Sequence, residues 1–241
     1  MRSHDVRALV LVLLLGCSRG DADPRASAPA GSNRAPERSY PSIRSHLEAQ
    51  RLALARDLDH HRASSLARAR ELLIATLRDE ILPAWNGTPW DFSGTSQTPQ
   101  QGKIACGYFV STTLLHLGLQ VERVRMAQQA SEHIAQSLIS THPLRRSSDQ
   151  PIDAFLAKVR SHGAGIYIVG LDNHVGFLIV DPADTWFHHA GPRDVVKREP
   201  AHEAPYLVAS RYRVFGKLFD DALVESWLLG NQIATVTPKR P

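Results

Sequence analysis

Apolar residues recur at helical spacing over residues 42–82, in two successive runs. The polar stretch HHRASS at residues 60–65 separates these runs. The runs contain Ile43, Leu47, Leu54 and Leu58, and then Leu66, Leu73, Leu77 and Ile81. This pattern predicts a helical hairpin, or one long helix with a break, that ends at Pro83. Adjacent helical residues do not face the same point, so we interpret His60 and His61 as solvated side chains rather than metal ligands.

A third helix is predicted for the sequence CGYFVSTTLLHLG at residues 106–118. It follows a loop over residues 86–105 that is dense in turn-forming residues. Its expected buried positions are Phe109, Val110, Thr113, Leu114 and Leu117. Gly118 is a natural C-terminal stop for this helix. Residues 125–139 and 151–162 are expected to form two further amphipathic helices.

From residue 163 onward, the spacing of apolar residues changes to a pattern that is typical of buried strands. Apolar and β-branched runs occupy residues 163–170, 173–181, 185–191 and 210–218. A last helix is expected over residues 221–230. Because helices precede a run of antiparallel strands, the sequence predicts an α+β protein.

The N-terminus has the layout of a secretory signal. Arg2 and Arg7 precede an apolar run that ends at Gly16 and Cys17, and this run is too short to span a bilayer. Leu14-Leu15-Gly16-Cys17 resembles the lipobox of bacterial lipoproteins. The resemblance implies that residues 1–16 are removed and that Cys17 is lipidated; the alternative is a plain signal peptide cleaved after Cys17.

Residues 17–41 are rich in Ser, Ala, Pro, Gly and Arg, and are expected to form a flexible tether between the lipid and the domain. Position 19 is Arg rather than the Asp of the usual inner-membrane retention signal. The expected location is therefore the bacterial cell envelope, with the lipid in the outer membrane and the domain facing the periplasm.

Cysteine usage makes Cys106 a candidate for chemistry. The chain has two cysteines, so lipidation of Cys17 leaves no partner for an intramolecular disulfide. Exported proteins usually use cysteine in disulfides, which makes a free thiol notable, although a buried inert cysteine is the alternative. Cys106 lies in the first turn of its helix, where backbone N–H groups and the helix dipole favour a thiolate with a lowered pKa and stabilise an oxyanion.

The composition and charge of the chain exclude one functional class, the nucleic-acid-binding proteins. Hydrophobic residues make up 43% of the chain and charged residues 22%, as in soluble globular domains. The net charge is +4, and no Lys/Arg cluster is interleaved with aromatic residues, so nucleic acid is not an expected partner.

The strand pattern permits a geometric test for histidine pairing. If residues 181–184 form the turn, Val180 pairs with Thr185 and Gly176 with His189. His189 then shares a sheet face with His174 and lies one diagonal step away from it, while His188 points to the other face. A turn with an odd number of residues would exchange His188 and His189.

Four stretches in order resemble the NlpC/P60 superfamily of papain-like cysteine peptidases: GTPWDFSG, ACGYFV at a helix start, HVGFLIV, and FHHAGP on the next strand. The resemblance covers roughly residues 87–192 and implies a papain-like catalytic domain over residues 84–235. It carries over Cys106 as nucleophile, His174 as general base and acid, and His189 as the orienting third residue. Trp90 replaces a family tyrosine near the oxyanion, and Gly107 and Tyr108 are the other expected cleft residues.

The implied function is a cell-envelope hydrolase that cleaves amide bonds of peptidoglycan stem peptides through an acyl-enzyme, without a cofactor. One alternative is an acyltransferase or thioesterase on a related scaffold. Another is a non-catalytic lipoprotein that binds a partner in its cleft or on the helices of residues 42–83. Asp181 or Asp184 as the third residue ranks lower, because alternation places Asp181 off the His174 face. A zinc site formed by Cys106, His174 and His189 lacks an evident fourth ligand.

Overall fold

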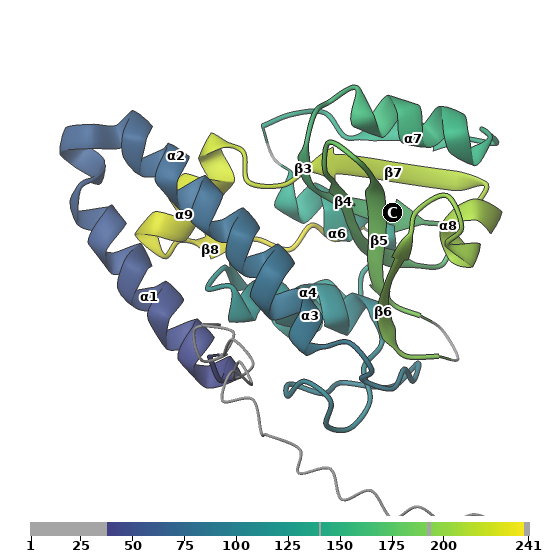
Figure 1. Cartoon of the computed structure of the whole chain (residues 1–241), viewed down its shortest axis with the longest axis horizontal. Coiled ribbons are helices and arrows are strands. Elements are labelled where there is room, and N and C mark those ends of the chain that lie inside the picture. Colours follow the sequence, from purple (N-terminus) through teal and green to yellow (C-terminus); the bar gives the residue numbers. More distant parts are fainter. Residues whose placement is uncertain (1–37, 140, 192–193, 239–241) are drawn as a thin grey trace, which may run out of the picture. The chain divides into compact units, whose positions relative to one another are not determined.

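The computed structural model describes residues 38–139, 141–191 and 194–238 (Figure 1). The predicted signal peptide over residues 1–16, the lipidation of Cys17 and most of the expected tether lie outside the described residues.

The N-terminal helices form the predicted hairpin. Helix α1 (Tyr40–Arg56) begins two residues earlier than expected, because Ser39 caps it and Pro41 lies in its first turn. Helix α2 (Leu58–Thr76) follows after Asp57, and His61 has non-helical dihedral angles (φ −138°, ψ 45°) within the expected break. The apolar faces of both helices are buried in the main core, so the hairpin covers other elements of the fold.

Pro83 does not end the helical segment, which corrects the sequence prediction. The chain continues through a π-helical turn, η1 (Leu77–Ile81), into the short helix α3 (Leu82–Ala84). In this turn the Leu82 N–H bonds to the Leu77 carbonyl, five residues back. Pro83 then lies in the first turn of α3, where a missing N–H is tolerated.

An antiparallel sheet of six strands follows, in the order β2-β7-β3-β4-β5-β6. Its strands are β2 (Arg145–Ser148), β3 (Gly165–Leu171), β4 (Val175–Val180), β5 (Thr185–Ala190), β6 (Val196–Pro200) and β7 (Tyr212–Lys217). The four predicted strands are confirmed. The sequence patterns did not predict β2 and β6, because RRSS and VKREP lack apolar alternation. A small parallel sheet joins β1 (Gln120–Val121) to β8 (Gln232–Ile233).

The remaining helices are α4 (Cys106–His116), α5 (Arg123–Ala127), α6 (Ser131–Leu138), α7 (Ile152–Arg160), α8 (Pro205–Ala209) and α9 (Asp221–Leu229). Helix α4 and its Gly118 stop are confirmed, with Gly118 at φ +91°. The single helix expected over residues 125–139 is instead α5 and α6, because Ala130 is extended (ψ 147°) between them. Within the described part of the chain, no helix has the length and apolarity needed to cross a membrane.

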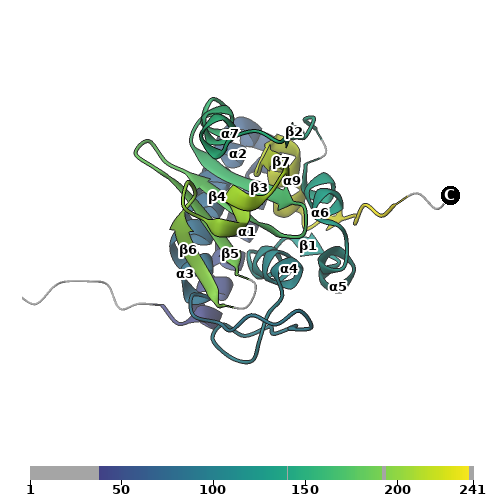
Figure 2. The ribbon, with the colours of Figure 1, turned by 90° about the vertical axis from the view of Figure 1, so that its right-hand side faces the viewer.

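Helices cover both faces of the sheet. In Figure 1, α1, α2 and α9 lie to the left of the sheet and α8 to its right, and Figure 2 shows α4, α5 and α6 grouped together. Ile168 and Phe177 face the core shared with the first group, whereas Val169 and Leu178 face a second core with α7 and α8. Burial on both faces explains why the central strands are continuously apolar. The mixed α+β class is therefore confirmed.

Candidate active site

Cys106 is held at the N-terminus of α4 by the preceding loop. The Ile104 N–H bonds to the Pro89 carbonyl and the Ala105 N–H to the Gly94 carbonyl, each at 2.9 Å. Phe109, one turn into the helix, packs against Phe177 of β4 with ring centroids 6.1 Å apart. The helix that carries the cysteine is thus fixed directly on the sheet.

The electrostatic environment of Cys106 differs from the sequence expectation. Burial raises the pKa of its thiol, and hydrogen bonds from the backbone N–H groups of Val175, Gly107 and Cys106 offset only part of that rise. The predicted lowering of this pKa by the helix start is therefore wrong, because desolvation outweighs it. The resting sulfur is a protonated thiol that needs a base before it can attack.

Gly107 permits the close contact between α4 and α5. A Cβ atom built at this position would lie 2.3 Å from the backbone carbonyl oxygen of Ala127. This contact explains why the residue after the cysteine is glycine: a side chain there would force the two helices apart.

We expect Gly107→Ala to lower the free energy of unfolding by about 1–3 kcal/mol, because a backbone carbonyl cannot move aside cheaply. Ser111→Ala is the matched control: Ser111 is buried in the same helix, and its substitution removes atoms instead of adding them. Its expected cost is about 1 kcal/mol or less. Denaturant titration of both variants measures the difference, and equal costs would contradict the steric explanation.

The predicted histidine pair is confirmed. Strand β4 pairs with β5 in the predicted register, with Val180 opposite Thr185, and His174 lies just before β4. The Nε2 atom of His174 lies 2.7 Å from Nδ1 of His189, and both side chains are buried. The two nitrogens face each other at hydrogen-bonding distance, so they do not converge on a shared metal ion.

A carboxylate that the sequence analysis missed completes this arrangement. Nε2 of His189 lies 2.8 Å from Oε1 of Glu199 on β6, and the other carboxylate oxygen accepts from Lys197 Nζ at 3.0 Å. Lys197 also forms an ion pair with Asp194 at 3.0 Å. The only available signal was the alternation of Lys197 and Glu199 around Arg198, which has no apolar residues to mark a strand.

The hydrogen-bond chain determines the tautomers of both histidines. A carboxylate only accepts, so His189 donates from Nε2 to Glu199. Nδ1 of a neutral His189 is then an acceptor, and His174 donates to it from Nε2. Nδ1 of a neutral His174 is therefore unprotonated. This atom is buried and has no hydrogen-bond partner among the described residues.

Both histidines are held neutral. Burial lowers the pKa of His174 to about 3, and the positive charge of a protonated His189 would lower it further. Burial also lowers the pKa of His189 to about 3, and the Lys197 ammonium adds to this effect. His174, the base in this chain of hydrogen bonds, is thus an uncharged imidazole at neutral pH.

Cys106 and His174 line one cavity of about 320 Å³. Gly107, Ser131, Asp172 and Val175 also contribute to its wall. The Val175 N–H contacts the Cys106 sulfur, so this sulfur lies beside the backbone from which the His174 ring projects. Cys106 and His174 thus contribute to the wall of one cavity, and a chain of hydrogen bonds runs from His174 through His189 to Glu199.

The other predicted cleft residues lie elsewhere. Neither Trp90 nor Tyr108 is among the residues that line this cavity. Both are partly buried and pack against the main core. The Arg123 guanidinium lies over the Tyr108 ring, with its Cζ atom 4.9 Å from the ring centroid. The indole N–H of Trp90 is buried without a hydrogen-bond partner among the described residues.

The alternative third residues do not reach His174. His188 points to the opposite sheet face, where its ring stacks on Phe109 at 5.8 Å and neither nitrogen has a partner among the described residues. Asp181 lies in the turn, where its carboxylate accepts from the backbone N–H groups of Ala183 and Asp184 at 3.0 and 2.8 Å. Within the described ranges, no group of three or more His, Cys, Asp or Glu side chains is arranged to hold a metal ion.

Comparison with known proteins gave no family: no family model, no curated protein and no solved structure matches the chain significantly. Functional inference therefore depends on the geometry and chemistry of the site.

Proposed function

We propose that the protein is a cysteine hydrolase that cleaves amide bonds, with Cys106 as nucleophile and His174 as general base and acid. The observation that carries this proposal is the buried, unprotonated Nδ1 of His174, which has no hydrogen-bond partner among the described residues, in a residue that lines the same cavity as Cys106.

The reaction follows from these positions. His174 Nδ1 takes the thiol proton as the Cys106 sulfur attacks the amide carbon, and the carbonyl oxygen becomes an oxyanion near the N–H groups at the start of α4. The protonated Nδ1 then gives its proton to the leaving amine, and a thioester remains. Water adds to the thioester, with His174 again as base, and releases a carboxylic acid and the free thiol.

The chain of hydrogen bonds from His174 to Glu199 stabilises the imidazolium that forms when His174 takes the thiol proton. When Nδ1 is protonated, the imidazolium donates from Nε2 to His189, which in turn donates to the Glu199 carboxylate. Glu199 thereby supplies a negative charge two hydrogen bonds from the base. We propose that this arrangement is papain-like, because the helix with the nucleophile packs on the strands that carry the base and its partner.

We further propose that the enzyme works in the bacterial cell envelope, anchored by a lipid at Cys17 in the outer membrane, and that its substrate is the peptide part of peptidoglycan. The support is the N-terminal sequence pattern together with the amide-cleaving chemistry. Purified peptidoglycan incubated with the full chain is expected to release stem-peptide fragments with new amino and carboxyl ends, seen by mass spectrometry. Cys106→Ala is the control; no fragments, or the same fragments from this variant, would contradict the proposal.

Glu199 is expected to act as a positioning residue. Glu199→Ala removes the acceptor that fixes the His189 tautomer, and should slow alkylation of Cys106 by iodoacetamide about tenfold or more. Glu199→Gln retains an acceptor oxygen and should recover part of the rate. Arg198→Gln is the matched control on the same strand, because Arg198 stacks on Trp186 at 4.2 Å and does not touch the chain of hydrogen bonds. Equal rates for Glu199→Ala and Arg198→Gln would contradict this role.

A further inference from the structure

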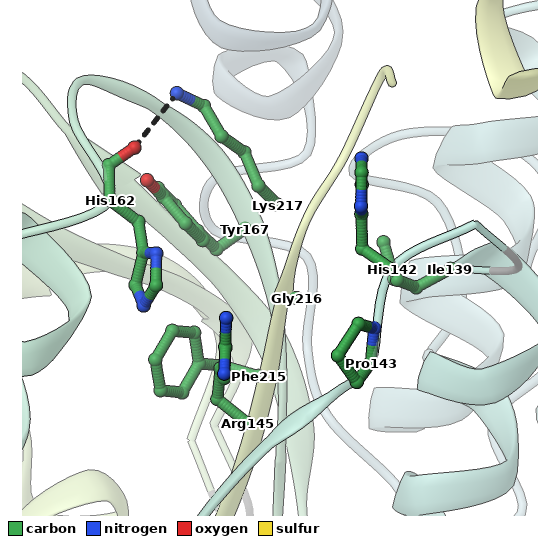
Figure 3. Close-up of a pocket in the computed structure, with 9 residues that line it drawn as sticks. All are labelled: Ile139, His142, Pro143, Arg145, His162, Tyr167, Phe215, Gly216 and Lys217. Atoms are coloured by element: carbon green, nitrogen blue, oxygen red, sulfur yellow. Dashed lines mark hydrogen bonds between the residues drawn. The ribbon is translucent and has the colours of Figure 1, made fainter. Parts of the chain in front are cut away.

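A second cavity, of about 260 Å³, lies where β2 begins beside β7, and shares no lining residue with the Cys106 cavity. Figure 3 shows His162 and Lys217 on one side of Gly216, His142 on the other, and Arg145 below. The aromatic rings of Tyr167 and Phe215 contribute apolar surface. The cavity thus combines an apolar wall with four basic side chains.

The charges in this cavity are not neutralised. Among the described residues that line it, none is an aspartate or a glutamate. Arg145 makes no ion pair within the described part of the chain, whereas its neighbour Arg146, directed to the other face of β2, forms an ion pair with Glu132 at 2.5 Å. The Lys217 ammonium has a backbone carbonyl, that of His162 at 3.2 Å, as its hydrogen-bond acceptor.

The electrostatics of Lys217 agree with this surplus of positive charge. Burial lowers the pKa of its ammonium, and the nearby positive charge of Arg70 lowers it further. An anion bound beside Lys217 and Arg145 would relieve that repulsion.

The backbone at the cavity is also open to a partner. Strand β2 pairs with β7 from Tyr212 to Phe215, whereas β3 pairs with the other side of β7 as far as Lys217. Lys217 therefore extends past the end of β2 with its main-chain groups directed away from β3, whereas those of Gly216 are directed to Ile168 of β3. Such a strand edge binds extended peptide by main-chain hydrogen bonds.

We propose that this cavity binds the C-terminal end of a short peptide, with the carboxylate between Arg145 and Lys217 and the last, apolar side chain against Tyr167 and Phe215. Arginine suits a carboxylate because its donors form a planar fork, and the ring surfaces favour an apolar last residue. The main-chain groups of Lys217, on the side of β7 away from β3, would pair with the peptide backbone. This proposal is independent of the hydrolase reaction.

Calorimetric titration of the full chain with N-acetyl-alanyl-leucine tests the proposal, with the same peptide as its C-terminal amide and with inorganic phosphate as comparisons. We expect the free acid to bind about tenfold or more tightly than the amide, and Arg145→Gln to weaken binding of the acid by a similar factor. Arg146→Gln is the matched control and should leave the affinity unchanged.

Three results would overturn the proposal. The acid and the amide could bind alike, or Arg145→Gln could bind the acid as well as wild type does. Phosphate could bind as tightly as the peptide acid, which would make the cavity a simple anion site. Binding of the acid that is intact in His174→Ala and lost in Arg145→Gln would support it and assign the event to this cavity, whatever the outcome for the hydrolase.

Discussion

Replacing His174 with alanine is expected to slow the alkylation of Cys106 by iodoacetamide near neutral pH by about 100-fold or more. The reason is that burial raises the pKa of the thiol, so little thiolate exists without a base in the cavity. General bases contribute about 10²–10⁴-fold to such proton transfers. Intact-mass spectrometry of the full chain, followed by mapping of the labelled peptide, measures the rate at Cys106.

The control for this variant is His188→Leu. His188 is a second buried histidine, and it lies on the face of the sheet opposite to His174 and His189.

 The His188→Leu substitution removes a histidine of similar burial and leaves the hydrogen bonds that connect His174, His189 and Glu199 in place. We expect the His188→Leu protein to alkylate at the wild-type rate. If His174→Ala reacts as fast as wild type while it remains folded, His174 is not the base.

Acidification is expected to unfold the protein well before its carboxylates are fully protonated. Burial lowers the pKa of four histidines: His174, His188 and His189 to about 3, and His116 to about 4. In the unfolded chain each takes up a proton near pH 6.5, whereas in the folded chain it stays neutral. The free energy of unfolding is therefore highest above about pH 6.5 and falls as the pH drops toward the folded values.

The expected slope is large. Each extra proton bound by the unfolded chain costs about 1.4 kcal/mol per pH unit, so four histidines remove several kcal/mol over one or two units. Total stabilities are about 5–15 kcal/mol, so acid unfolding should fall within this window. Denaturant titrations at a series of pH values measure the slope. His188→Leu should make it shallower by about one proton, and a free energy that stays constant as the pH falls from 7 to about 4.5 would contradict buried neutral histidines.

Strand periodicity predicted the central geometry of the site. The alternation in HVGFLIV and TWFHHAG, with a turn of even length, was sufficient to place His174 beside His189 and to direct His188 away. This prediction succeeded because a strand has a fixed period of two and one buried register. Helix α4 was predictable for a similar reason, since its apolar positions and Gly118 mark its length and its end.

Other features depend on tertiary contacts that no local pattern encodes. Glu199 was missed because β6 is a polar edge strand whose place beside β5 follows from the rest of the sheet. The direction of the Cys106 pKa shift depends on how deeply the folded chain buries the thiol. The π-helical turn that accommodates Pro83 likewise involves backbone bonding that residue preferences do not specify.

The pH dependence of Cys106 alkylation tests the central claim most directly. The claim is that a neutral His174 takes the proton from a neutral thiol, with a histidine pKa of about 3 and a raised thiol pKa. The rate constant for the folded protein should therefore be nearly constant between about pH 6 and about pH 8. A rate that rises about tenfold per pH unit over this range, as for an isolated thiol below its pKa, would contradict it.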